Sequence, residues 1–489
     1  MSDERIPEDW QILLAELERR TTAARQMGGA EKLQKRAAQG RRNARELVEL
    51  FIDPGSFEEV GTLAGGVSYH GEETAPADAL VGGIGRINGA PVVLTVEDFT
   101  VQGGSIGHGN NAKRLRLTSI ALQHKLPFIM LLDGAGARMS NALQRYPYSP
   151  IDLQVLAQLA GKVPTIAVVV GASAGHSSVG GLLMDFVIML KGAVMFAAGP
   201  PLVAAALGEV VSKEELGGAA MHTRISGVAH NMVESEDAAA RLVRDYLAYF
   251  QERTIDRAEA APQAELLRLI PAKARSPYDM VPVIQQLLDM GSFLQIQPDY
   301  GRAMVTGLAR LNGHALAVVA NQPAVLAGAI DATAAEKAAD FITRVDNLGL
   351  PVLFLADTPG VMSGAAAERA GTLRSTARMY HAQAHMQSPK LHVTIRKAFG
   401  FGSFVMAMNP FDRQTISLGL PGVSLGRLPV DGGAQAANLD DDSARRLRDA
   451  QTSGAWTAGD ELAYDEIVDP RDLRQRLITA IEIALKGSS

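Results

Sequence analysis

The sequence predicts an α/β protein made of two tandem domains that arose by internal duplication, with a helical arm at the N-terminus. Short apolar runs rich in β-branched residues alternate with stretches of helical periodicity, which is typical of parallel sheets covered by helices. Glycine-rich turns follow these apolar runs. The same anchors also recur 224 positions apart: Gly89 with Gly313, Pro127 with Pro351, and Asp133 with Asp357.

The N-terminal arm, residues 1–50, is expected to be helical and is highly charged. Its basic side chains include Lys32, Lys35, Arg36, Arg41, Arg42 and Arg45. These side chains could form either a helical face exposed to water or a positively charged surface that binds a phosphorylated ligand. Of these two interpretations we expect the solvated face.

In the first repeat, buried strands are expected at residues 91–96, 127–132 and 165–170, with a helix over residues 110–124. The second repeat predicts strands at residues 315–320, 352–356 and 391–395, with a helix over residues 334–348. The distance in sequence between corresponding residues of the two repeats grows from 224 to 225 before the third strand, where Ser388-Pro389 corresponds to Val163-Pro164. A repeat of about 220 residues lies near the upper end of the usual domain size.

The segment 258–276 is rich in Ala, Glu and Arg and contains Pro262 and Pro271, so it is expected to connect the halves. We therefore place the domains at residues 1–260 and 261–489. The most apolar region, residues 182–207, is interrupted by Asp185, Lys191 and a proline pair. It is expected to be buried core rather than a membrane span.

Composition narrows the class of protein further. The chain has 489 residues and a net charge of −6, so it lacks the basic surplus that nucleic-acid binding needs. It has no cysteine, which excludes disulfides, zinc ribbons and thiol nucleophiles. The N-terminus is acidic and polar, unlike a signal peptide. We expect a soluble, cytoplasmic protein.

Four glycine-rich turns follow strands at matching places in the two halves: Asp133-Gly-Ala-Gly-Ala-Arg138, Gly171-Ala-Ser-Ala-Gly175, Asp357-Thr-Pro-Gly-Val361 and Phe399-Gly-Phe-Gly-Ser403. Small residues let the backbone approach a ligand, and free amides can hold a phosphate or a developing oxyanion. The Walker and GxGxxG patterns are absent, which argues against nucleotide phosphates. In any single turn the glycines could serve only to make a tight connection between a strand and a helix. Because the turns occur in pairs in a duplicated chain, oxyanion binding is the favoured interpretation.

Side chains that could act as a nucleophile, a base or a metal ligand are few. Ser173, Ser177 and Ser178 lie near His176 in sequence, but no GxSxG elbow is present, and we expect His176 to be a packing or surface residue. His381 and His385 share a helix face without a third ligand, so no metal site is predicted. Turns lined by amides, without an obvious base, suit a reaction in which an enolate is stabilised and a second substrate supplies the base.

Several motifs resemble one known family, the carboxyltransferase (β) subunits of biotin-dependent acyl-CoA carboxylases, such as acetyl-CoA and propionyl-CoA carboxylase. In the first half the resemblance rests on Ile52-Asp-Pro-Gly-Ser-Phe57, Glu97-Asp-Phe-Thr-Val-Gln-Gly-Gly-Ser105, Asp133-Gly-Ala-Gly-Ala-Arg-Met139, Asp185-Phe-Val-Ile-Met-Leu-Lys-Gly192, Glu214-Glu-Leu-Gly-Gly218 and Ser226-Gly-Val-Ala-His230. In the second half it rests on Pro277-Tyr-Asp279, Ala320-Asn-Gln-Pro323, Glu336-Lys-Ala338, Asp357-Thr-Pro-Gly360, Arg396-Lys-Ala-Phe-Gly400 and Ile467-Val-Asp-Pro-Arg471.

This resemblance implies a crotonase-type fold in each half, a homohexamer, and active sites between the N-half of one subunit and the C-half of another. The acyl-CoA enolate would be held by the amides of Gly136 and Ala137, and the carbonyl of carboxybiotin by those of Phe401 and Gly402. Further residues implied at the site are Gly360 and Gly400 for biotin, and Gly103, Gly104, Ala174, Gly175 and Phe404 for the acyl-CoA substrate.

The same resemblance implies that carboxybiotin donates CO₂ and that the freed biotin nitrogen takes the α-proton of the acyl-CoA. Biotin is expected on a separate biotinylated α subunit, because the chain has no Met-Lys-Met signal and no ATP-binding module. The sequence departs from the family at Phe401, which replaces a glycine, at Phe404, at Gly134-Ala135 and at His176, which replaces a small residue. An acyl-CoA decarboxylase, a biotin-independent enzyme that stabilises a CoA enolate, and a non-catalytic partner subunit therefore stay open as alternatives.

Overall fold

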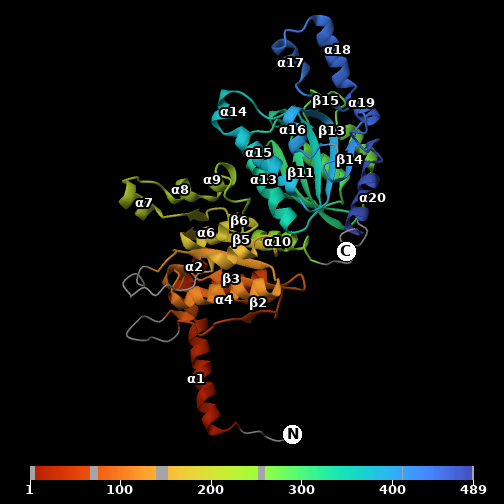
Figure 1. Ribbon diagram of the computed structural model, residues 1–489. Coiled ribbons are helices and arrows are strands. Elements are labelled where there is room, and N and C mark those ends of the chain that lie inside the picture. Colours follow the sequence, from red (N-terminus) through yellow and green to blue (C-terminus); the bar gives the residue numbers. More distant parts are fainter. Residues whose placement is uncertain (1–5, 66–74, 139–151, 252–258, 410, 487–489) are drawn as a thin grey trace. The chain divides into compact units, whose positions relative to one another are not determined.

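The computed structural model describes residues 6–65, 75–138, 152–251, 259–409 and 411–486 (Figure 1). Contacts divide the chain into two compact units, unit 1 from Met1 to Arg244 and unit 2 from Asp245 to Ser489. This division falls before the domain boundary expected after residue 260, which stays a prediction. Each unit contains one sheet of eight strands.

Unit 1 begins with three helices, α1 (Glu8–Arg25), α2 (Ala30–Ala38) and α3 (Ala44–Phe51). The strands of its sheet run in the order β1-β2-β3-β4-β5-β6-β8, and β7 pairs with β5. Their bounds are β1 Glu58–Glu59, β2 Leu80–Ile87, β3 Ala90–Glu97, β4 Phe128–Gly134, β5 Thr165–Ala174, β6 Phe186–Leu190, β7 Val194–Phe196 and β8 Asn231–Val233. The helices that follow α3 are α4 His108–His124, α5 Leu153–Leu159, α6 His176–Leu182, α7 Pro200–Leu207, α8 Lys213–Gly217, α9 Ala219–Arg224 and α10 Glu236–Leu247, which crosses the division.

Unit 2 repeats this plan with the strand order β16-β14-β13-β12-β11-β10-β9, and β15 pairs with β13. The strands are β9 Leu294–Ile296, β10 Met304–Leu311, β11 His314–Asn321, β12 Val352–Thr358, β13 Lys390–Phe399, β14 Gln414–Gly419, β15 Ser424–Gly426 and β16 Glu466–Ile467. The helices are α11 Leu266–Leu269, α12 Met280–Leu287, α13 Ala332–Asn347, α14 Ala365–Arg369, α15 Thr372–His385, α16 Gly400–Val405, α17 Val430–Ala436, α18 Asp441–Thr452, α19 Gly454–Asp460 and α20 Leu473–Lys486.

The duplication is confirmed by strand register. Leu80 pairs with Glu97 in unit 1, and Met304 pairs with Asn321 in unit 2, so both partners are displaced by 224 positions. Each hairpin turns on an Asn-Gly pair with positive φ at both residues, 54° and 80° at Asn88-Gly89. That backbone geometry is the one that a two-residue type I′ turn requires. All six predicted strands and both predicted helices are present at their expected positions.

A buried lysine ties α4 in unit 1 and α13 in unit 2 to the hairpin of the same unit. The Nζ of Lys113 on α4 donates to the carbonyls of Ala77 and Leu80, and the Nζ of Lys337 on α13 donates to Met304 at 2.8 Å. Lys337 and Met304 each lie 224 positions after their counterparts. Burial lowers the pKa of Lys113 to about 8 and that of Lys337 to about 7.

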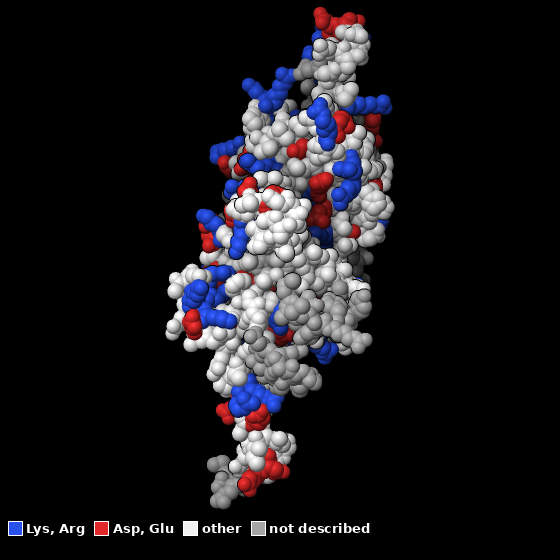
Figure 2. All heavy atoms as spheres, turned by 90° about the vertical axis from the view of Figure 1, so that its left-hand side faces the viewer, with Lys and Arg blue, Asp and Glu red and all other residues white. Residues whose placement is uncertain are grey.

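The apolar region 182–207 is only partly core. Strands β6 and the start of β7 are buried, but α7 buries no residue, and Leu202 and Leu207 are 63% and 74% exposed. The expectation of a buried segment is therefore wrong for α7, because this helix carries apolar side chains that its own unit does not cover. No helix within the described ranges is long and apolar enough to span a membrane. On the face drawn in Figure 2, acidic and basic side chains are interspersed.

Candidate functional site

In unit 1 three turns meet at the ends of neighbouring strands. A Cβ atom built on Gly104 would lie 2.3 Å from the carbonyl oxygen of Asp133, and one on Gly136 would lie 2.8 Å from that of Ala174. Gly103 accepts a hydrogen bond from the Ala135 N–H at 3.0 Å. The structure therefore brings together the six predicted residues of this half: Gly103, Gly104, Gly136, Ala137, Ala174 and Gly175.

The main chain holds the turn after β4 in a fixed orientation. The Ile106 N–H donates to the Gly136 carbonyl at 2.8 Å, and the Arg138 N–H donates to the Ile106 carbonyl at 3.1 Å. This pattern is a parallel bridge between Ile106 and Ala137, so the Ala137 N–H points away from Ile106. Neither Gly136 nor Ala137 donates its N–H to an acceptor among the described residues. Two neutral donors are thus available at this turn.

Asp133 anchors the turn to the N-terminal arm. Its carboxylate, at the end of β4, is 1% exposed and lies 2.7 Å from Arg36 Nη1 and 2.9 Å from Arg41 Nη2. It also accepts from the Ala172 N–H at 3.2 Å. The expectation of a solvated basic face is wrong for Arg36, which is 7% exposed, because it neutralises a buried carboxylate 97 residues away.

A second buried carboxylate supports the same turn from β3. Burial raises the pKa of Glu97, while Arg114, the Ser177 hydroxyl and the Asp133 N–H donate to it. A Cβ atom on Gly134 would lie 2.8 Å from Glu97 Oε2, so the turn passes directly over this carboxylate. The Ser177 hydroxyl is therefore occupied by Glu97 and is not the nucleophile of a triad.

His176 is the first residue of α6, directly after Gly175. Its Nε2 lies 2.6 Å from Oδ1 of Asp152, a carboxylate that is 1% exposed. The interpretation of His176 as a packing or surface residue missed this partner. The two residues are 24 positions apart in sequence, and no motif marks Asp152.

In unit 2 the predicted residues gather in the same way. A Cβ atom on Gly402 would lie 2.7 Å from the Cα of Gly360, and one on Gly400 would lie 2.7 Å from the Arg427 carbonyl oxygen. Gly400 has a φ of 54°, whereas Phe401 is an ordinary helical residue of α16. The N–H groups of Phe401 and Gly402 donate to no acceptor within the described part of the chain. These two N–H groups could therefore both donate to one carbonyl oxygen.

The bulky side chain of Phe401 does not require a strained backbone. Its ring centroid lies 5.5 Å from that of Tyr380 on α15 and 6.3 Å from that of Phe404, in an edge-on arrangement. Phe401 and Phe404 remain 47% and 42% exposed. The two rings thus form an exposed aromatic surface beside the Phe401 and Gly402 amides.

Asp357 is the counterpart of Asp133, but its partners come from different elements. Its carboxylate lies 2.8 Å from Arg396 Nε and accepts from the Tyr278 hydroxyl at 2.8 Å. Burial and the neighbouring Asp357 raise the pKa of Tyr278. Each unit therefore keeps a neutralised carboxylate under its turn, and the chemical partners have diverged.

Two cavities lie near residues that flank these turns, but none of the predicted site residues lines either cavity. One of about 680 Å³ is lined in part by Asp133, Gly171 and Ala172, together with Arg41 and Lys191. Another, of about 430 Å³ in unit 2, is lined by Ala327, Pro359 and Phe399 among others. The described residues contain no group of three or more His, Cys, Asp or Glu side chains that could hold a metal ion.

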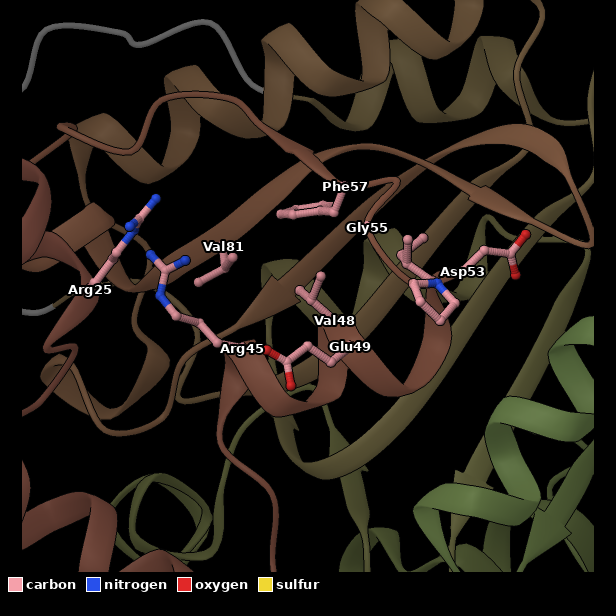
Figure 3. A pocket seen from close by; sticks show the side chains of 10 residues that line it. Arg25, Arg45, Val48, Glu49, Asp53, Gly55, Phe57 and Val81 are labelled. Atoms are coloured by element: carbon pink, nitrogen blue, oxygen red, sulfur yellow. The ribbon is translucent and has the colours of Figure 1, made fainter.

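A further cavity of about 690 Å³ lies at α3 (Figure 3). Val48, Phe57 and Val81 give it an apolar wall, and the guanidinium groups of Arg25 and Arg45 lie at the same end. Arg45 is paired with Glu59 at 2.9 Å. None of the predicted site residues lines this cavity, so it is separate from the turn at Gly136.

Comparison with known proteins gives consistent matches over nearly the whole chain. The model of the carboxyl transferase domain matches residues 35–489. The methylmalonyl-CoA carboxyltransferase 12S subunit of Propionibacterium freudenreichii subsp. shermanii is 32% identical over 477 residues, covering 93% of this chain and 91% of that relative. The biotin-dependent acetyl-/propionyl-coenzyme A carboxylase beta5 subunit of Mycobacterium leprae is 36% identical over 414 residues, covering 80% of this chain and 75% of that relative.

A solved structure gives the same result. The transcarboxylase 12S hexamer, with methylmalonyl-CoA and methylmalonic acid bound, matches with a TM-score of 0.90 and 31% identity, covering 98% of this chain and 97% of that one. Together with the tandem crotonase-like units and their paired turns, these matches show that the chain belongs to the carboxyl transferase family.

Proposed function

We propose that the chain is the carboxyltransferase subunit of a biotin-dependent acyl-CoA carboxylase, which moves a carboxyl group from carboxybiotin to the α-carbon of an acyl-CoA. The main support is the pair of turns with free N–H donors, one in each unit, at Gly136-Ala137 and at Phe401-Gly402. Two relatives are named for methylmalonyl-CoA and for acetyl-/propionyl-coenzyme A, which supports an acyl-CoA thioester as the substrate of this chain.

The first turn is suited to the thioester. The N–H groups of Gly136 and Ala137 would donate to its carbonyl oxygen and would bind more strongly as negative charge develops there. Because the donors belong to the backbone and are held by the bridge to Ile106, they need no reorganisation during the reaction. The buried ion pairs of Asp133 keep the turn rigid.

The second turn is suited to the ureido carbonyl of biotin. The ring of Phe401 packs on Tyr380, so the side chain leaves the Phe401 and Gly402 donors accessible. Carboxybiotin, when bound, supplies CO₂ and a nitrogen that can accept the α-proton. The residues present thus fit this group, and Gly402, without a side chain, lets its turn approach that of Gly360.

The proposal includes a homo-oligomer, a hexamer as described for transcarboxylase 12S, and a biotinylated partner subunit. The test is turnover of purified protein with a matched biotinylated subunit, ATP, bicarbonate and a panel of acyl-CoAs. Carboxylation supports the proposal. Decarboxylation of malonyl-CoA or methylmalonyl-CoA without carboxylation would instead support a decarboxylase, and assembly without either activity a non-catalytic partner.

A further inference from the structure

The cavity at α3 takes no part in the proposed reaction. Its volume is about 690 Å³, which lies within the range of sites that hold small molecules. The lining residues come from the end of α1, from α3, from the segment 52–57 and from β2, all in unit 1. The cavity is therefore a second place on this unit where a small molecule can bind.

One wall of the cavity is apolar. Val48, Ile52 and Val81 are buried residues that line it, and Phe57 is half-buried. Figure 3 shows the ring of Phe57 beside Val48 and Val81. A hydrocarbon chain or an aromatic ring placed against this wall would be removed from water, which favours binding. The wall thus selects a ligand with an apolar body.

The end of the cavity that carries Arg25 and Arg45 is cationic. Arg25 is exposed in the last turn of α1 and makes no ion pair with a described residue. Arg45, in the first turn of α3, uses Nη1 and Nη2 for Glu59, at 2.9 and 3.2 Å. Its Nε is buried and has no hydrogen-bond partner among the described residues. Two guanidinium groups are thus balanced by one carboxylate, so this end attracts an anion.

The acidic residues of the lining do not cancel this charge. Asp53 lies on the opposite side of the view from Arg25 in Figure 3. Its carboxylate already accepts from Arg244 Nη1 at 2.6 Å and from the Gly89 N–H at 2.8 Å. Glu49 is exposed on α3, so water and salt screen its charge. A bound anion would therefore meet one screened negative charge, that of Glu49.

We propose that this cavity binds a carboxylate with an apolar tail, at a site separate from that of the acyl-CoA. The carboxylate accepts hydrogen bonds from Arg25 and Arg45, and the tail lies along Val48, Phe57 and Val81. A guanidinium group suits such a ligand, because its planar N–H donors match the two oxygens of a carboxylate. An amine with the same tail would be repelled, and an alcohol would gain only the apolar contact.

Calorimetric titration of the whole chain with octanoate tests this site, with octan-1-ol and octylamine as probes of the same length. Octanoate is expected to bind saturably. The alcohol and the amine should bind about 10-fold more weakly or worse, because neither makes a charge-assisted hydrogen bond to a guanidinium group. An excess of acetyl-CoA should leave the affinity for octanoate unchanged, since the two sites are separate.

Variants of the lining test each part of the cavity. Arg25→Gln should weaken octanoate binding by about 10-fold or more, while carboxylation measured without octanoate stays unchanged. Arg19→Gln is the matched control, because Arg19 lies on the same helix and is 68% exposed but does not line the cavity. Phe57→Ala should weaken the binding of octanoate and octan-1-ol alike. Glu49→Gln should strengthen octanoate binding, because it removes a like charge.

Absence of saturable octanoate binding in the wild type would overturn the proposal. Equal affinity for octylamine would do the same, as would wild-type affinity in Arg25→Gln and Phe57→Ala proteins that circular dichroism shows to be folded. Competition between octanoate and acetyl-CoA would place octanoate at the acyl-CoA site, which would overturn the separate site and leave the proposed function intact.

Discussion

In the proposed function, Ala137 acts through its N–H and not through its methyl group. The bridge to Ile106 fixes the direction of that N–H. Ala137→Pro removes this single donor and keeps the carbonyl, so turnover should fall by about 10² to 10³, as for loss of one oxyanion-hole donor. Steady-state carboxylation measures it, with Ala137→Ser as the control that keeps the N–H. Unchanged turnover in a folded Ala137→Pro protein would place the hole elsewhere.

Phe401 tests whether the second turn also works through its backbone. Because the ring rests on Tyr380 and the backbone is helical, Phe401→Gly should keep the N–H and leave kcat largely unchanged. The KM for the biotinylated partner is expected to change, since an exposed aromatic side chain is lost. A large gain in kcat would show that the ring blocks the site. Loss of acyl-CoA binding with every biotin-dependent step intact would assign the residue to the substrate side.

At the residue scale, the sequence predicted which turns approach one another but not what holds them. Gly136 and Gly402 could be predicted because two backbone segments can approach this closely only where a residue has no side chain, and such a position is visible in the sequence as a glycine. The pairs Arg36–Asp133 and His176–Asp152 could not, because each joins residues brought together only by tertiary packing. A charge run such as that containing Arg36 looks the same whether it faces water or a buried carboxylate.

Among the elements, β13 and α16 are joined by a buried histidine. The Nδ1 of His392 lies 2.8 Å from the Met406 carbonyl oxygen just after α16, and Nε2 lies 2.8 Å from the Thr394 hydroxyl. Burial lowers the pKa of His392 from 6.5 to about 4. The folded state therefore excludes a proton that the unfolded chain binds between these pH values.

It follows that unit 2 should lose stability as the pH falls from 6.5 towards 4. For this one group the loss between pH 7 and pH 5 is about 2 kcal/mol. Urea unfolding at the two pH values measures it, and His392→Gln should show a smaller decrease than the wild type by that amount. Equal pH dependence in both proteins would mean that His392 is protonated in the fold.

The elements themselves were the most predictable part of the chain. Strands such as β4 and β12 are continuous apolar runs because both faces of a parallel sheet are covered. The helix α7 was predicted wrongly as buried, since hydropathy cannot distinguish a covered apolar helix from one that its own unit leaves exposed.

For the whole molecule, such uncovered apolar surface indicates assembly. Helix α1 places Trp10, Leu13, Leu14 and Leu17 along one side, and Ile6 lies just before its start; these five side chains are each between 42% and 60% exposed. This α1 stripe, defined by those five residues, is expected to pack against a second copy of the chain. Light scattering after size exclusion should therefore give a mass well above 51.9 kDa.

The double variant Trp10→Glu/Leu14→Glu should shift this assembly to smaller species, because charges would enter the interface. Ile12→Glu is the matched control, since Ile12 is 67% exposed but lies on the other side of α1. A monomeric wild type at micromolar concentration would contradict the predicted assembly, and an unchanged mass in the double variant would place the contact away from α1.

The proposed use of main-chain donors at both turns has a consequence for how this gene can diverge. Almost any codon change at Ala137 or Phe401 keeps the N–H group, with proline the exception. Under this proposal most missense changes at these two positions keep the donors, whereas Gly136 and Gly402 cannot change as freely, because a Cβ atom on either would lie 2.8 Å or less from the backbone. Point mutations at Ala137 and Phe401 can therefore change the surroundings of the site while both N–H groups are kept.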